Sequence, residues 1–259
     1  MVFGLLRARR TQQGSAGAPP RVPDRHLVYA IGDIHGRADL LERMLAQIAD
    51  DAARRPDFAK YIIYLGDYVD RGPDSALVVE RLLAGPPPGF GAIHLKGNHE
   101  VALLDFLNDV RIGPTWFADN IGGGMTLASY GVLPPADPND PDHLAAAQAH
   151  FRAALPAAHR AFLTKDLRTH VTIGDYLFVH AGVRPGVPLA EQREEDLLWI
   201  RRDFLTSTAD HGKIVVHGHT IAPEPEQRAN RIGIDTGAYA TGRLTCLALE
   251  GAEQRFLST

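Results

Sequence analysis

Only one cysteine is present among the 259 residues, and this scarcity excludes an intrachain disulfide framework. A chain without disulfides fits a reducing compartment, and we expect a cytoplasmic protein. The single cysteine, Cys246, lies inside the apolar run at 244–249. We interpret it as a small core residue and not as a nucleophile.

Long hydrophobic runs are missing as well. The sequence has no stretch of about 18 apolar residues, the length of a transmembrane helix, so we predict no membrane partner. The apolar residues near the start are too few for a signal peptide. Positive charge is not in excess either, because 27 Lys and Arg stand against 31 Asp and Glu. The resulting net charge of -4 disfavours nucleic acid as the main partner.

Residues 1–24 differ in composition from the rest of the chain. They contain arginines at 7, 9, 10 and 21, a Gly/Ser/Ala/Pro-rich run at 14–20, and no acidic residue before Asp24. We predict a disordered tail over 1–24. The remaining residues, 25–259, are enough for one domain with a sizeable core.

Three apolar runs, at 27–31, 61–65 and 92–95, each lead into a polar turn and then into a helical pattern. The runs predict buried strands, and the spacing of apolar residues predicts helices over 38–53 and 101–107. A further helix is expected to begin at Asp74 or Ser75 and to end before the prolines at 86–88. Repeated strand–turn–helix units predict an α/β fold with a mostly parallel sheet, whose polar turns share one edge.

The pattern changes after residue 110. We predict a small helical insertion over about 110–169, with helices at 145–155 and 159–167 and loops at 122–124 and 134–141. Strand patterns return at 176–179, 213–216, 232–234, 243–250 and 254–257, with little helix between them. They predict a second, more antiparallel sheet, and hence two mixed β-sheets flanked by helices.

Side chains that can bind metal follow six of the predicted strands. They are Asp33 and His35, Asp67 and Asp70, Asn98 and His99, His180, His217 and His219, and Asp235. Carboxylate, imidazole and amide oxygen together suit Mn, Fe or Zn better than Ca or Mg. Six or more ligands are too many for one ion. With Asp67 as a shared carboxylate the set divides between two ions, an arrangement used for phosphoryl displacement.

These segments also resemble the motifs of a known family. Residues 32–36 (GDIHG), 66–72 (GDYVDRG) and 97–100 (GNHE) resemble the three signature motifs of the calcineurin-like metallophosphoesterases of the PPP type, the Ser/Thr protein phosphatases. Residues 180–182 (HAG), 218–220 (GHT) and 234–238 (IDTGA) resemble the downstream motifs. The resemblance covers about residues 26–250 and is greatest to small bacterial and bacteriophage-lambda-type phosphatases. It implies a metallophosphoesterase-type sandwich.

The resemblance implies a role for each matching residue. Asp33, His35 and Asp67 would hold one divalent ion, and Asp67, Asn98, His180 and His219 the other, with manganese expected first and iron or zinc as alternatives. A hydroxide bridging the ions would attack phosphorus in line. In the family His99 is the general acid, oriented by the carboxylate that matches Asp70, and Arg71 and Arg201 would grip the phosphate.

Some residues are left with other interpretations. Arg202 could take the role of its neighbour Arg201. We interpret His217 and Asp235 as support for the ligands and Trp199 as a packing residue. Tyr239 and the glycines at 122–124 could line the substrate groove.

The leading hypothesis is a metal-dependent phosphomonoesterase that acts on phosphoserine or phosphothreonine in a phosphoprotein or phosphopeptide, with phosphotyrosine as an additional substrate. The alternative is a symmetrical dinucleoside tetraphosphatase on the same fold. The motif Asp70-Arg71-Gly72 and Glu100 favour the phosphatase. A third hypothesis, a scaffold without activity, is disfavoured because all six ligands are present. The sequence does not determine the oligomeric state, and we expect a monomer.

Overall fold

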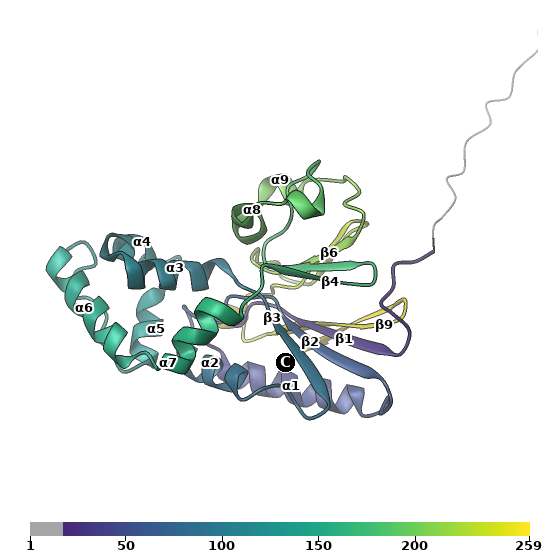
Figure 1. The fold of residues 1–259 in the computed structure, drawn as a ribbon, viewed down its shortest axis with the longest axis horizontal. Coiled ribbons are helices and arrows are strands. Elements are labelled where there is room, and N and C mark those ends of the chain that lie inside the picture. The colour runs from purple at the N-terminus through teal and green to yellow at the C-terminus, as the bar shows by residue number, and fades with distance from the viewer. Residues whose placement is uncertain (1–17) are drawn as a thin grey trace, which may run out of the picture.

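Two five-stranded β-sheets, stacked one on the other, form the centre of the computed structural model, which describes residues 18–259 (Figure 1). The first sheet has the strand order β10-β9-β1-β2-β3 and the second β4-β5-β6-β8-β7. Helices lie on the outer faces of both sheets. The predicted pair of mixed sheets flanked by helices is confirmed.

The first sheet is parallel in one half and antiparallel in the other. Its strands are β1 (His26–Ile31), β2 (Ala59–Tyr64), β3 (Phe90–His94), β9 (Thr245–Glu250) and β10 (Glu253–Ser258). β1, β2 and β3 run parallel, as predicted, whereas β9 pairs antiparallel with β1 and β10 with β9. We had expected the late strands to belong to the second sheet, and for β9 and β10 this was wrong. β9 is buried along nearly its whole length, including Cys246, and it lies inside the first sheet between β1 and β10.

The second sheet is also mixed. Its strands are β4 (His170–Ile173), β5 (Tyr176–Val179), β6 (Ile214–His217), β7 (Glu226–Gln227) and β8 (Arg231–Gly233). The three central strands β5, β6 and β8 are parallel, and β4 and β7 close the two edges antiparallel. Strands β4 and β7 were not predicted. They are only partly buried and carry polar residues, so no apolar run marks them.

The alternation of side chains along β1 explains why this strand is a continuous apolar run. Leu27, Tyr29 and Ile31 point to the core shared with the helices. Val28 and Ala30 point to the core between the two sheets. Because successive side chains of a strand face opposite sides, a strand buried on both faces has no polar position.

Two pairs of helices cover the outer faces. α1 (Ala38–Ala52) and α2 (Ser75–Leu83) lie under the first sheet, and α8 (Glu194–Trp199) and α9 (Arg202–Leu205) lie above the second (Figure 1). α1 buries the apolar stripe that predicted it, including Leu41, Met44 and Ile48. Asp74 is the N-cap residue of α2, but its side chain makes no capping hydrogen bond. The remaining short elements are η3 (Leu189–Glu191) and α10 (Ala238–Thr241).

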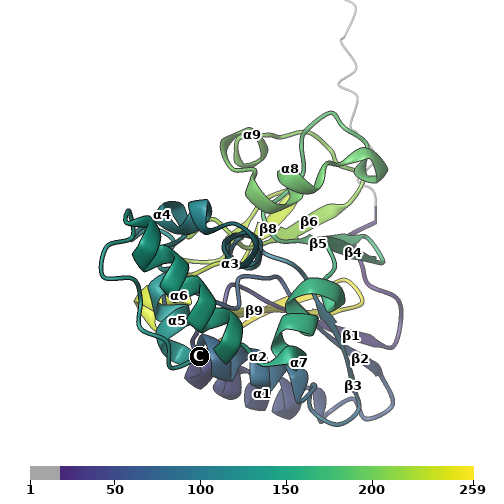
Figure 2. The same cartoon turned by 60° about the vertical axis from the view of Figure 1, so that its left-hand side comes forward.

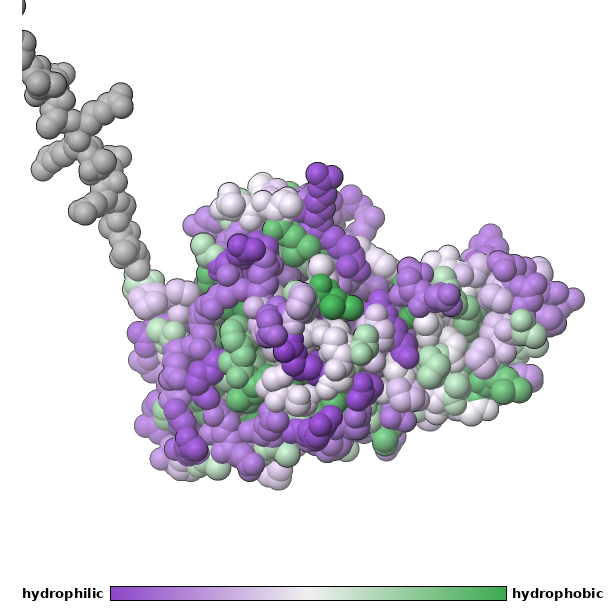
Figure 3. All heavy atoms as spheres, turned by 180° about the vertical axis from the view of Figure 1, so that it is seen from behind, coloured by the Kyte–Doolittle hydropathy of each residue, from purple (hydrophilic) through white to green (hydrophobic). Residues whose placement is uncertain are grey.

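The segment after β3 forms a helical layer beside the sheets. It contains α3 (Asn98–Asn108), η1 (Val110–Ile112), α4 (Gly113–Trp116), α5 (Gly123–Ser129), α6 (Pro141–Ala154), α7 (Ala157–Ala161) and the π-helical turn η2 (Phe162–Asp166). Figure 2 brings α4, α5 and α6 forward, and from behind the same helices form a projecting lobe (Figure 3). The expected loop at 122–124 was wrong in part, because Gly123 and Gly124 begin α5.

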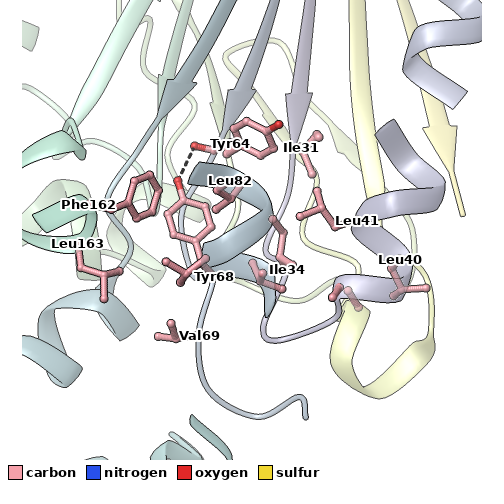
Figure 4. Packing of buried hydrophobic residues seen from close by; sticks show 14 of the residues in the cluster. Ile31, Ile34, Leu40, Leu41, Tyr64, Tyr68, Val69, Leu82, Phe162 and Leu163 are labelled. Atoms are coloured by element: carbon pink, nitrogen blue, oxygen red, sulfur yellow. Dashed lines mark hydrogen bonds between the residues drawn. The ribbon is translucent and has the colours of Figure 1, made fainter. Parts of the chain in front are cut away.

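The core holds the turn after β2 in place. Tyr68 is fully buried among Ile34, Tyr64, Phe162 and neighbouring apolar residues (Figure 4). Its hydroxyl donates to the carbonyl of Leu95, at 2.6 Å, and lies 3.4 Å from that of Tyr64. This anchor directly follows Asp67, so packing in the core fixes the position of that carboxylate.

The predicted tail overlaps the folded domain. Val22 is fully buried, and its N–H donates to Gly251 O, while Arg21 O accepts from Asp175 N. From Arg21 onward the chain is therefore part of the domain, and the prediction for residues 1–17 lies outside the described residues. Within 18–259, none of the helices combines the length and apolar character that crossing a bilayer requires.

Candidate metal centre

Polar side chains from six strand ends meet at one edge of the sandwich. Each side chain belongs to a residue just after the carboxyl end of a strand, as expected for a ligand site in an open α/β sheet. All are almost completely buried, with exposed fractions of 5% or less: Asp33, His35, Asp67, Asp70, Asn98, His99, His180, His219 and Asp235. A buried charged group or imidazole is costly without a partner. The contacts of these side chains therefore indicate what the site can bind.

Asp67 lies at the centre of the cluster. Its Oδ2 is 3.5 Å from His35 Nε2, 3.4 Å from His180 Nε2 and 3.8 Å from His99 Nε2. Two groups of potential ligands result, one of His35, Asp67 and His99 and one of Asp67, His180 and His219. Asp67 belongs to both groups, which is the position that the sequence predicted for a shared carboxylate.

Backbone carbonyls set the tautomers of two histidines. His35 Nδ1 is 2.8 Å from Val69 O, and His180 Nδ1 is 2.9 Å from Leu65 O. A carbonyl can only accept, so each Nδ1 carries the proton and each Nε2 presents a lone pair. The lone pair of His180 Nε2 faces acceptor oxygens, Asn98 Oδ1 at 2.9 Å and Asp67 Oδ2 at 3.4 Å. His35 Nε2 is 3.5 Å from Asp67 Oδ2 and accepts from Arg71 NH1 at 2.9 Å. Converging acceptors of this kind, with the second ring nitrogen held by a carbonyl, are the pattern of metal-binding histidines.

Three buried atoms at the site have no hydrogen-bond partner within residues 18–259. They are Asp33 Oδ1, His219 Nε2 and Asp235 Oδ2, while Asp33 Oδ2 accepts from His219 N at 2.9 Å. Burial, followed by the charges of Asp235 and Asp67, raises the pKa of Asp33 well above its usual range. Burial and the neighbouring His180 lower the pKa of His219 to about 2, so its ring is neutral. Unpartnered carboxylate oxygen and neutral imidazole nitrogen are donors that a divalent transition metal accepts, so the residues fit metal ions.

His99 and Asp70 form a second arrangement beside this cluster. His99 Nδ1 lies 2.8 Å from Asp70 Oδ2. Burial disfavours the charged ring, but the carboxylates of Asp67 and Asp70 outweigh burial and raise the pKa of His99. The pair therefore keeps a proton available on the imidazole, with Nε2 directed to the side of Asp67.

Two residues of the insertion complete the surroundings of Asp70, and the sequence did not reveal them. Trp116 Nε1 donates to Asp70 Oδ2 at 3.1 Å, and Thr126 Oγ1 donates to Asp70 Oδ1 at 2.6 Å. Thr126 Oγ1 is also 2.8 Å from the Asp70 N–H. Trp116 and Thr126 lie 46 and 56 residues after Asp70, and no local motif marks either of them.

Glu100 fixes the backbone around Asp67, a role that we did not predict. Its carboxylate accepts from the N–H groups of Asp67, Tyr68 and Gly97 at 2.8–2.9 Å. Glu100 is the third residue of α3 and Gly97 its N-cap, so the bond to Gly97 is half of a capping box. A Glu three residues after a helix cap is a sequence signal that could have identified this contact.

The backbone at the site adopts an unusual conformation. Within residues 18–259 six non-glycine residues have positive φ, and five of them are His35, Asp67, Asp70, Arg71 and His219, at 46° to 69°. Side chains other than glycine occupy this region at a cost of about 1–3 kcal/mol each when the surroundings hold them there. Such strain concentrates at functional sites, and here it follows the candidate ligands.

Arg71 lies at the entrance to the cluster. Its NH1 is 2.9 Å from His35 Nε2, its NH2 donates to Asn120 O, and its guanidinium lies 4.8 Å from the centre of the Tyr239 ring. A groove of about 410 Å³ begins here, and Tyr239, Gly122 and Gly124 are among its lining residues. Residues of the insertion, including Phe117 and Met125, form its other wall.

Arg201 lies on the opposite side, near the second ligand group. Its positive charge contributes to lowering the pKa values of His180 and His219, and its NH1 is 3.5 Å from Thr220 Oγ1. Trp199 is 44% exposed with its ring 6.4 Å from that of His219, so its interpretation as a packing residue does not hold. His217 belongs to neither ligand group, and its ring packs edge-on against Phe204 at 5.1 Å.

Comparison with known proteins identifies the family of this chain. Residues 26–246 match the model of the calcineurin-like phosphoesterase family. The chain is 30% identical over 229 residues to serine/threonine-protein phosphatase 2 of Escherichia coli strain K12, an alignment of 84% of this chain and 90% of the relative. It is 32% identical over 158 residues to a symmetrical bis(5'-nucleosyl)-tetraphosphatase of Acidovorax sp. strain JS42. That match covers 61% of this chain and 44% of the length of the relative.

Solved structures agree on the fold. A crystal structure described as a suggested diadenosine tetraphosphatase superposes with a TM-score of 0.61 at 22% identity, over 90% of this chain and 93% of the other. A cold-active protein tyrosine phosphatase superposes with a TM-score of 0.52 at 15% identity, over 92% of this chain and 81% of the other.

Proposed function

The chain belongs to the calcineurin-like phosphoesterase family, and on that premise we propose that it is a metal-dependent phosphomonoesterase acting on phosphoserine and phosphothreonine in proteins. One observation carries the proposal: Asp67 is common to two groups of buried ligands, and the His99–Asp70 pair lies directly beside it. The relative that aligns with 84% of this chain and over 90% of its own length is named a serine/threonine-protein phosphatase.

The ligand assignment follows the family resemblance, and the unpartnered Asp33 Oδ1 and His219 Nε2 support it. Asp33, His35 and Asp67 would hold one divalent ion, and Asp67, Asn98, His180 and His219 the other, with manganese proposed first and iron or zinc as alternatives. Two cations there would supply Lewis acidity toward the phosphoryl oxygens and acidify a water that attacks phosphorus. The buried carboxylates and neutral imidazoles of the chain supply the negative charge and the lone pairs for these ions.

The chain itself supplies the proton for the leaving group. When the bond between phosphorus and the ester oxygen breaks, the serine or threonine alkoxide needs a proton, and His99 would donate it from Nε2. Asp70 keeps the other ring nitrogen protonated and the ring oriented, because its carboxylate accepts from His99 Nδ1. Trp116 and Thr126 hold Asp70 in turn.

Two arginines would bind the phosphate from opposite sides. Arg71 stands beside the first ligand group and Arg201 beside the second. A guanidinium matches the geometry of phosphate oxygens and is always charged, so both would stabilise the charge that develops during transfer. We assign this role to Arg201 and not to Arg202, because Arg201 is the arginine whose charge acts on His180 and His219.

A second candidate is hydrolysis of dinucleoside tetraphosphates. The match to the Acidovorax tetraphosphatase and the superposition on the suggested diadenosine tetraphosphatase favour it. The groove beside Arg71 is lined by Phe117 and Tyr239, and flat aromatic rings could contact a base as well as a peptide side chain.

A substrate panel distinguishes the two. The manganese-loaded protein would be offered a phosphoserine peptide, a phosphothreonine peptide and diadenosine tetraphosphate, with p-nitrophenyl phosphate as a general measure of activity. We expect the phosphopeptides to be cleaved with the highest kcat/KM. Cleavage of the dinucleotide alone would refute the proposal, and repeating the panel with iron and zinc would identify the active metal.

A further inference from the structure

A pocket separate from the metal centre lies between the loop after α9 and the ends of β6, β7 and β8. It encloses about 390 Å³, which is within the range of small-molecule sites and many times the space of one water. His217, Arg231, Arg228, Glu226 and Thr208 are among its lining residues. None of these belongs to the ligand groups around Asp67.

The charges that line the pocket do not balance. Arg228 and Arg231 both pair with Glu226, whose two oxygens accept from them at 2.7–3.1 Å. Glu226 is the single acid among the lining residues, so two guanidiniums share one carboxylate. Arg231 is 5% exposed. Because its guanidinium is buried and shares its carboxylate with Arg228, the pocket favours an anionic ligand.

Two of the lining residues each have a buried side-chain atom with unused hydrogen-bonding capacity, and the two are of opposite kinds. Arg231 Nε is a donor with no partner in residues 18–259, and His217 Nε2 has none either. His217 Nδ1 lies 3.1 Å from Gly218 O, so Nδ1 carries the proton and Nε2 is an acceptor. A complementary ligand therefore has an anionic oxygen for the arginine and an acidic O–H for the histidine.

We propose that this pocket is an oxyanion site that binds a hydrogen phosphate group, either free or carried by a small organic molecule. A hydrogen phosphate group supplies both the charged oxygens and the O–H, whereas sulfate supplies only the oxygens. The hydroxyls of Thr208 and Thr220 lie in the same wall and can donate to further oxygens. The proposal does not depend on which phosphoester the metal centre hydrolyses.

The absence of a side chain at Gly233 provides a way to block the site. A Cβ added there would lie 3.1 Å from His217 Nε2 and Cε1, and so would crowd the acceptor. Gly233 has ordinary strand dihedrals, so alanine does not strain the backbone. Arg228 offers an independent change, because its side chain is 61% exposed and can be truncated without opening the core.

One lining residue of the pocket lies next to a candidate ligand in the chain. Thr220 lines it, follows the candidate ligand His219 in the chain, and lies 3.5 Å from Arg201 NH1.

The test measures binding and needs no turnover. Calorimetric titration of the metal-loaded full chain with inorganic phosphate should show one more bound phosphate per chain than either Gly233→Ala or Arg228→Ala. The matched control is Arg111→Ala, which removes another exposed arginine paired with an acid two residues away. It should keep the wild-type stoichiometry, and thermal melting would confirm that the variants are folded.

Two further titrations determine which anion the pocket binds. Sulfate should not displace phosphate from this site, and displacement would refute the role of His217. Phenylphosphonate, which cannot be hydrolysed as an ester, should bind if the site takes an organic phosphate, whereas binding of inorganic phosphate alone would indicate the free anion. Equal stoichiometry in the wild type and both pocket variants, or a phosphate-soaked crystal with only water there, would overturn the proposal.

Discussion

The substitution His99→Asn is the sharpest test of the proposed site, because the structure permits two roles for this residue. His99 Nε2 lies 3.8 Å from Asp67 Oδ2 and so falls within the first group of potential ligands. Its Nδ1, however, is bound to Asp70, and Asn98 directly before it offers a ligand oxygen to the second group. We expect a general acid and not a ligand.

The size of the effect follows from that role. General acid catalysis typically contributes about 10²- to 10⁴-fold to the rate. The variant should therefore lose about 3–5 kcal/mol of transition-state stabilisation. The loss should be greater for a phosphoserine peptide than for p-nitrophenyl phosphate, because nitrophenolate leaves more readily without a proton.

The assay combines kinetics with metal analysis. Values of kcat for both substrates would be compared with the metal content per chain, measured by plasma mass spectrometry on the same samples. We expect a reduced kcat with two ions per chain. Loss of one ion would show that His99 binds metal, and an equal loss of rate for both substrates would refute its role as the general acid.

Three further predictions address other parts of the structure. Asp67→Asn should remove both ions together and abolish turnover, and retention of one full equivalent of metal would contradict a shared carboxylate. Thr126→Val removes both hydrogen bonds between Thr126 Oγ1 and Asp70. A loss of about 1–2 kcal/mol should lower kcat about 5- to 30-fold with unchanged metal content. Ser129→Ala, on the same helix without contact to Asp70, is the control. Burial lowers the pKa of His94 from 6.5 to about 4. Below pH 6.5 the unfolded chain binds a proton that the folded chain does not, so stability falls as the pH decreases toward 4. Between pH 7 and 5 the wild type should lose about 1–2 kcal/mol more unfolding free energy than His94→Phe, as measured by urea denaturation. Equal losses would show that His94 does not titrate in this way.

The sequence predicted the parallel half of the first sheet, β1 to β3, and a set of candidate ligands because both depend on local signals. Each ligand follows an apolar strand, and parallel strands bring their carboxyl ends to one edge, so Asp33 and Asp67 had to meet. The placement of β9 depended instead on long-range pairing with β1, which its apolar pattern could not specify. Trp116 and Thr126 contact Asp70 because the insertion packs against it. Long-range packing of this kind produces no regular residue spacing from which the contact could be predicted.

The hydrogen bonds of the buried carboxylates separate positioning residues from candidate ligands. Glu100 accepts three backbone N–H groups, and Asp70 accepts from His99, Trp116 and Thr126, so the oxygens of both are satisfied by the chain. Asp33 Oδ1 and Asp235 Oδ2 are buried at the same edge and lack any donor in the described part of the chain. An unsatisfied buried carboxylate costs several times more than a satisfied one, and adding a second like charge increases that cost. Asp33 therefore keeps a carboxylate oxygen available to a cation, which Asp70 does not, and on this ground we propose metal binding for Asp33 and orientation of His99 for Asp70.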